Sequence, residues 1–75
     1  MIIDYTILIH QAKEGGFWSE VPSLPGCFSQ GETIDETMQS TKEAIEAHLL
    51  ALKEDQIVAP VEESLFIGRV QVEVA

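Results

Sequence analysis

The sequence predicts one α+β domain in which three short antiparallel strands are followed by a helix and a fourth strand. Apolar and polar residues alternate with period two over four short segments, which is typical of half-buried strands. A stretch rich in proline and glycine at residues 21–31 interrupts the second and third of them, and apolar residues recur at helical spacing over residues 34–52. A chain of 75 residues has room for one folded unit, so we expect residues 1–75 to form a single domain.

The first two strands are predicted at residues 2–10 and 17–21, joined by a hairpin loop that contains Gly15 and Gly16. One face of the first strand is expected to carry Ile3, Tyr5, Ile7 and Ile9. The other face is expected to carry Ile2 and Leu8 together with Asp4, Thr6 and His10. Both faces are therefore partly apolar.

Residues 21–31 are expected to form a structural corner between the second strand and a third strand at residues 27–30. Pro22 and Pro25 fix φ near about −65° and favour extended backbone at the residues before them. Gly26 can adopt a positive φ without steric cost. Cys27 follows this turn in an apolar setting, which is typical of a buried small side chain rather than of a nucleophile.

A helix is predicted to begin after Thr33, because Thr33 and Glu36 have the spacing of a capping box. Its expected core-facing stripe consists of Ile34, Met38, Thr41, Ile45, His48, Leu49 and Leu52. The helix is expected to end near Glu54, and the alternation over residues 66–74 predicts the fourth strand.

The order β-β-β-α-β has one economical topology. A strand, a helix and a second parallel strand form a right-handed crossover, so we expect a four-stranded mixed sheet of order 3-2-1-4 with the helix on one face. The other face would then be bare. With Ile2, Leu8 and Ile67 pointing to it, this face or an open edge strand is a candidate association surface.

Charge and size restrict the partners. Thirteen acidic and four basic residues give a net charge of −9, which repels nucleic acids and favours a basic protein partner. At this length apolar burial barely offsets the entropy of ordering the chain, and a single cysteine provides no internal disulfide, so we expect a homo-oligomer. The N-terminus lacks a basic leader and a membrane span, which predicts a cytoplasmic protein with no membrane partner.

Several chemistries are not supported by the residues present. His10 and His48 lack the companions of a metal site, and Gly15-Gly16 is not followed by a helix that would hold a phosphate, so no metal or cofactor is expected. The expected topology also resembles the start of the RNase H-like nuclease fold, whose chemistry needs clustered carboxylates. A metal-dependent nuclease would require Asp4, Glu20 and Glu73 to converge, and it remains a minor alternative.

Trp18 is the large aromatic side chain expected to face outward, with Glu14 and Glu20 nearby. Packing within the fold is one interpretation of this group. The other is an anchor for a basic partner, because tryptophan is frequent among the residues that dominate binding energy.

The succession Leu24-Pro25-Gly26-Cys27, Ser29-Gln30-Gly31, Thr33 and Lys42-Glu43-Ala44-Ile45 resembles the HicB family of antitoxins and antitoxin-like proteins. The resemblance extends from Tyr5 to Leu52. It implies a partial RNase H-like domain without enzymatic activity, which binds a small basic HicA-like ribonuclease toxin and covers its active site. Such antitoxins usually append a DNA-binding domain, and we expect none here.

Two classes of function therefore remain. The first is an antitoxin-type binding module that neutralises a basic ribonuclease. The second is a small self-associating HicB-like domain with a different partner or none.

Overall fold

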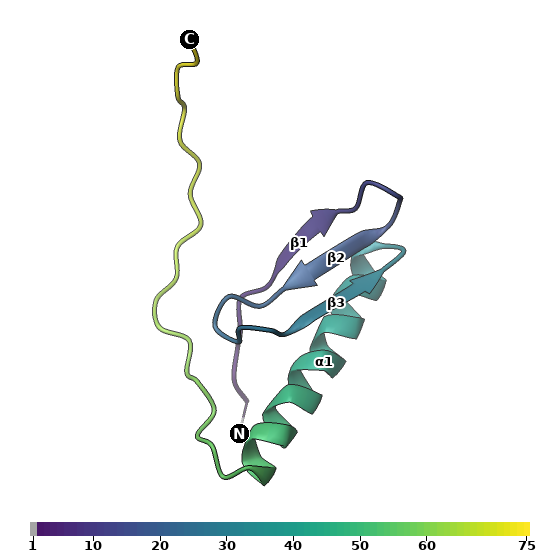
Figure 1. Ribbon diagram of the computed structural model, residues 1–75, viewed down its shortest axis with the longest axis vertical. Helices are drawn as coiled ribbons and strands as arrows, with labels where there is room; N and C mark the ends of the chain where they lie inside the picture. Colours follow the sequence, from purple (N-terminus) through teal and green to yellow (C-terminus); the bar gives the residue numbers. More distant parts are fainter. Residues whose placement is uncertain (1) are drawn as a thin grey trace.

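The computed structural model describes residues 2–75 and shows a three-stranded antiparallel sheet with one helix packed on one of its faces (Figure 1). The strands are β1 (Leu8–Gln11), β2 (Phe17–Glu20) and β3 (Phe28–Gly31), in the order β1-β2-β3, and the helix is α1 (Ile34–Glu54). The α+β class, the three-stranded meander and the helix are confirmed.

The corner between β2 and β3 is also the centre of the core. Val21, Leu24 and Cys27 are the buried apolar residues of the cluster on which helix residues pack. Two successive turns bring them together, because the Leu24 amide donates to the Val21 carbonyl and the Cys27 amide donates to the Leu24 carbonyl, each at 3.0 Å. Gly26 has a φ of +86°, the left-handed backbone that its place in the sequence predicts.

Helix α1 has well-formed caps at both ends. The Thr33 side chain accepts a hydrogen bond from the Glu36 amide at 3.0 Å, and the Glu36 carboxylate accepts one from the Glu32 amide at 3.0 Å. At the other end Gln56 adopts a φ of +59° and the Ile57 amide donates to the Leu52 carbonyl, which is a Schellman arrangement. These caps confirm the expected start and end of the helix.

The buried stripe of α1 differs from the expected one. Thr37 and Thr41 are fully buried, whereas Ile34 and Met38 are about half exposed, at 50% and 51%. The helix lies so close to the sheet that only short side chains fit at this point. The Ser19 and Thr41 hydroxyls are 2.6 Å apart, and the Thr41 hydroxyl also donates to the carbonyl of Thr37.

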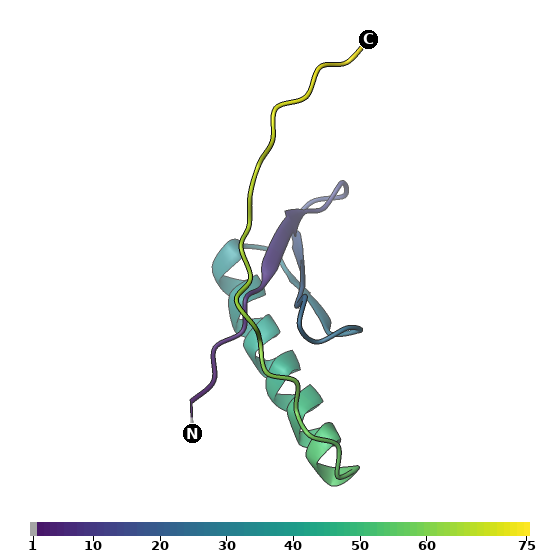
Figure 2. The same cartoon turned by 90° about the vertical axis from the view of Figure 1, so that its left-hand side faces the viewer.

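The prediction of a fourth strand within the same chain is wrong. In the part of the chain that the structure describes, no strand follows α1, and residues 57–75 run as an extended segment past the free side of β1 (Figures 1 and 2). The order 3-2-1-4 is therefore not formed. The segment is attached near its start, where the Tyr5 hydroxyl donates to the Pro60 carbonyl and Glu62 accepts from the Thr6 amide and hydroxyl.

A side chain thus takes the place of a strand partner at Thr6. Glu62 accepts from the Thr6 amide at 2.6 Å, so this amide, two residues before β1, is satisfied by a carboxylate instead of a backbone carbonyl. Toward the C-terminus the segment diverges from β1 and projects beyond the sheet (Figure 1). Alternation along the sequence indicated an extended conformation correctly, but it could not indicate which edge, if any, the segment joins.

Candidate partner-binding site

The face of the sheet opposite α1 is not covered by any other element of the described chain (Figure 2). Ser19 is buried against the helix, so its neighbours Trp18 and Glu20 point to the opposite side. The strand register then assigns the residues of this open face, which are Leu8, His10, Trp18, Glu20, Phe28 and Gln30.

Aromatic rings cross all three strands on the open face. His10 lies directly opposite Trp18, and their rings are stacked with centroids 4.1 Å apart and planes 18° apart. The rings of Trp18 and Phe28 are 6.5 Å apart and tilted by 48°. Trp18 is 37% exposed and Phe28 is 61% exposed, so the stack presents a substantial apolar surface to solvent.

An acidic group lies beside this aromatic stack. The Glu20 carboxylate is 2.7 Å from Nε2 of His10, an ion pair whenever the imidazole is protonated. The contact fixes the histidine ring over the indole, and the stack in turn supports one side of the Trp18 ring. The open face therefore combines a supported tryptophan with a carboxylate at its border.

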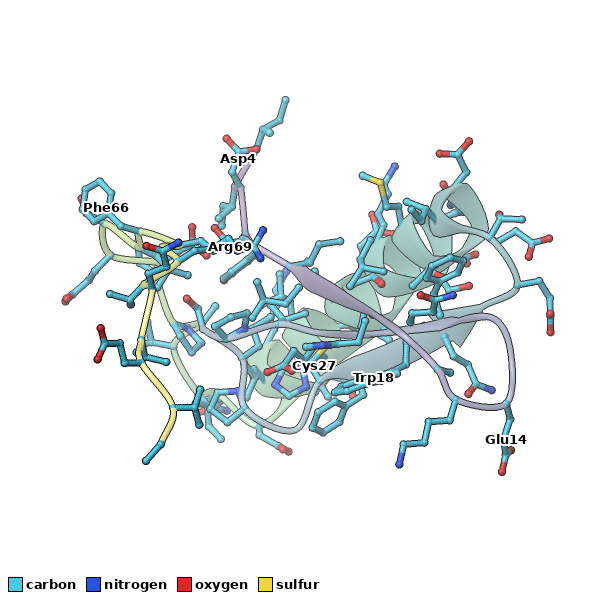
Figure 3. The ribbon with its side chains drawn as sticks, turned by 90° about the horizontal axis from the view of Figure 1, so that it is seen from above. Asp4, Glu14, Trp18, Cys27, Phe66 and Arg69 are labelled. Atoms are coloured by element: carbon cyan, nitrogen blue, oxygen red, sulfur yellow. The ribbon has the colours of Figure 1, made fainter. Side chains whose placement is uncertain are left out.

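The structure places two of the three residues that the sequence suggested for a partner site on the same face of the sheet. Trp18 and Glu20 share the open face, but Glu14 lies in the loop between β1 and β2, away from the Trp18 ring (Figure 3). His10 and Phe28 belong to the site and were not suggested. The hairpin register could have indicated His10, because a loop closed between Ala12 and Gly16 places it opposite Trp18.

The residues considered for catalysis do not form a centre. Cys27 is buried beside Leu24, and burial raises the pKa of its thiol, which disfavours the reactive thiolate. Among residues 2–75, no three side chains of His, Cys, Asp or Glu are grouped so as to hold a metal ion. Asp4 lies in the segment before β1 and Glu73 near the end of the extended segment, each on a different part of the chain from Glu20.

Comparison with known proteins settles the family. Residues 5–72 match the family model described as the HicB_like antitoxin of bacterial toxin-antitoxin systems. The chain belongs to the HicB-like antitoxin family. This HicB-like chain is 41% identical over 70 residues to a UPF0150 protein of Archaeoglobus fulgidus, with 93% of each chain covered. It is 40% identical over 67 residues to a UPF0150 protein of Synechocystis sp., covering 79% of the HicB-like chain and 85% of the relative.

A solved structure also resembles the HicB-like chain. The similar chain belongs to a HicA3 and HicB3 toxin-antitoxin complex, and it matches with a TM-score of 0.68 and 30% sequence identity. The match covers 80% of the HicB-like chain and 69% of the other. In the described part of the HicB-like chain, no helix has the length and apolar character needed to span a membrane.

Proposed function

We propose that this HicB-like chain is an antitoxin-type binding module that neutralises a small basic ribonuclease toxin through its open face. The observation that carries the proposal is the exposed aromatic stack of His10, Trp18 and Phe28 with Glu20 beside it. The family, and the presence of a toxin in the similar solved complex, support the same class of partner. The encounter would take place in the cytoplasm, where such a toxin meets RNA.

The chemistry of the open face suits cationic side chains. An arginine or lysine of the partner can lie over the exposed Trp18 or Phe28 ring, where the ring quadrupole attracts a cation. The Glu20 carboxylate has two oxygens, so it can accept hydrogen bonds from a guanidinium and still remain bonded to His10. The net charge of −9 would accelerate the encounter with a basic protein and would oppose direct binding of RNA or DNA.

We also propose that the chain acts by binding alone and catalyses no hydrolysis. The nuclease alternative requires Asp4, Glu20 and Glu73 around shared metal ions. Glu20 is instead engaged with His10 on the open face, and Glu73 lies in the extended segment outside the sheet. On this proposal, the chain shares part of the RNase H-like fold but not the catalytic carboxylates of that fold.

The test uses the product of a neighbouring gene that encodes a short protein rich in lysine and arginine. The purified chain should suppress cleavage of RNA by this protein and, alone with Mg²⁺, should leave RNA intact. Trp18→Ala should weaken binding by about 2 kcal/mol or more, about 30-fold in Kd, because an exposed and supported tryptophan is a typical binding anchor. Raising salt should slow association more than it changes dissociation.

The matched control is Ile34→Ala, which shortens a half-exposed apolar side chain on α1, away from the open face. It should change Kd less than twofold. A folded Trp18→Ala variant that binds normally, or association rates indifferent to salt, would contradict the proposed surface.

A second candidate, a self-associating domain with another ligand, is favoured by a separate observation. The edge of β1 is open and the extended segment after α1 is exposed. These two features concern the β1 edge of the sheet and not the open face that carries the aromatic stack.

A further inference from the structure

The extended segment after α1 carries an apolar face that its own chain does not cover. Phe66, Val70, Val72 and Val74 are each at least 78% exposed, although they alternate with Ile67, Arg69, Gln71 and Glu73 as in a strand with one buried face. Exposed apolar side chains in strand alternation, free of a partner strand, are a template for pairing with another chain.

The point at which the extended segment is attached explains why its apolar face is not covered by the sheet of the same chain. Glu62 is bonded to Thr6, and the segment runs in the same direction as β1 (Figure 1). Counting residue for residue from this contact, Ile67 is level with Gln11, where β1 ends. Residues 68–75 then extend about 25 Å beyond the strand, at about 3.3 Å per residue.

The same chain offers a place where such a strand fits. β1 is an edge strand of the sheet. An apolar groove lies between residues 2–7, which lead into β1, and the neighbouring side of α1. Ile3 and Ile7 line it from the first side, and Met38, Ile45 and Leu49 line it from the helix. Ile3 and Met38 are both substantially exposed, so the groove is open.

We propose that a second copy of the chain supplies the missing strand: residues 68–74 of each copy pair with the free edge of β1 in the other and place Val70 and Val72 in its groove. The exchange covers in one step the exposed face of the segment and the unpaired edge of β1. It leaves Arg69, Gln71 and Glu73 facing solvent. The open face with Trp18 lies on the other side of the sheet and stays available.

Electrostatics distinguishes this contact from binding of a basic partner. Two copies that each carry a charge of −9 repel one another, so added salt should strengthen self-association. The same change weakens attraction to a basic protein. Salt dependence of opposite sign therefore separates the two surfaces.

The test is light scattering of the full chain and two variants at equal concentration. The wild-type chain should have about twice the 8.3 kDa chain mass at micromolar concentration. Val72→Lys should raise the dimer dissociation constant at least tenfold, because it places a charge in the groove. Gln71→Lys adds the same charge on the solvent side and should leave the dissociation constant within twofold. Both variants should keep their helical circular dichroism, since the segment lies outside the core.

Exchange is shown directly by mixing copies that carry different isotopic labels. Nuclear Overhauser contacts from the methyl groups of Val70 and Val72 to Ile7 and Ile45 should arise between copies. A monomeric wild-type chain, contacts within one copy only, or a dimer equally stable in Val72→Lys would overturn the proposal. Binding of the basic partner by Val72→Lys through Trp18 should persist, so failure here is distinct from failure of the proposed function.

Discussion

Glycine-to-alanine substitutions at positions 26 and 31 should destabilise the fold for two different reasons and by different amounts. A Cβ at Gly31 would lie 2.7 Å from the Thr37 amide nitrogen and 2.8 Å from the Thr37 hydroxyl oxygen. Both distances are shorter than van der Waals contact, and the obstructing nitrogen belongs to the backbone of the first turn of α1. Gly31→Ala therefore requires the helix to move away from β3.

The magnitude follows from what this movement disrupts. Overpacking of a well-packed site costs about 1–3 kcal/mol. Loss of the Thr33 cap, whose bond to the Glu36 amide lies in the same turn, adds about 1 kcal/mol. We expect Gly31→Ala to lower the free energy of unfolding by about 2–4 kcal/mol.

Gly26 is in open space, with nothing within 4 Å of an added Cβ, and only its φ of +86° opposes a side chain. The left-handed backbone costs alanine about 1–2 kcal/mol, and the lower entropy of the unfolded alanine chain offsets about 0.4–1 kcal/mol. We therefore expect about 1 kcal/mol for Gly26→Ala. Gly68 has neither constraint, so Gly68→Ala should be close to neutral.

Thermal and urea unfolding at one protein concentration measure these differences, since self-association would shift the midpoint. For a domain of this size 1 kcal/mol corresponds to about 4–8 °C in Tm. Gly31→Ala should lower Tm by about 8 °C or more and Gly26→Ala by about 4–8 °C. Equal midpoints for Gly31→Ala and Gly68→Ala would refute the close approach of α1 to β3.

Two further predictions concern buried and exposed hydrogen bonds. Thr41→Val should lower the free energy of unfolding by about 1–3 kcal/mol, because it leaves the buried Ser19 hydroxyl without a partner. Ser19→Ala should lower it by only about 1 kcal/mol, because the Thr41 hydroxyl still donates to the Thr37 carbonyl. Urea unfolding compares the two variants, and a larger loss for Ser19→Ala would contradict this arrangement. Hydrogen bonds from the Thr6 amide and hydroxyl lower the pKa of Glu62. The Glu62–Thr6 contact is therefore complete above the pKa of Glu62 in the unfolded chain and is lost as pH falls through the lower pKa of the folded chain. The NMR chemical shift of the Thr6 amide should follow this titration, and a chemical shift that stays constant down to about pH 2 would contradict the prediction.

Local features of the fold were predictable from the sequence because each depends on residues close together in the chain. Thr33 marks the helix start by accepting a hydrogen bond from the Glu36 amide, and the Glu36 carboxylate accepts one from the Glu32 amide. Pro22, Pro25 and Gly26 restrict the backbone of the corner. The family resemblance rests on the same local features.

The buried stripe of α1 was predicted incorrectly because hydrophobicity alone does not measure the distance between two elements. Gly31 lets the helix approach the sheet so closely that Thr37 and Thr41 fill the interface, and the bulkier Ile34 and Met38 remain half exposed. A short polar side chain with a hydrogen-bond partner is buried there at little cost.

The sequence by itself determined the order of three strands and a helix, the corner and the acidic charge, since propensity, capping and turn geometry act over a few residues. Only the tertiary structure decided that Phe28 joins Trp18 on the open face, because the pairing of β2 with β3 across the corner places the two rings side by side. It also decided that residues 66–74 pair with no strand in the part of the chain that the structure describes. Alternation makes a segment extended and amphipathic, but its partner depends on where the chain is attached and how far the neighbouring edge extends.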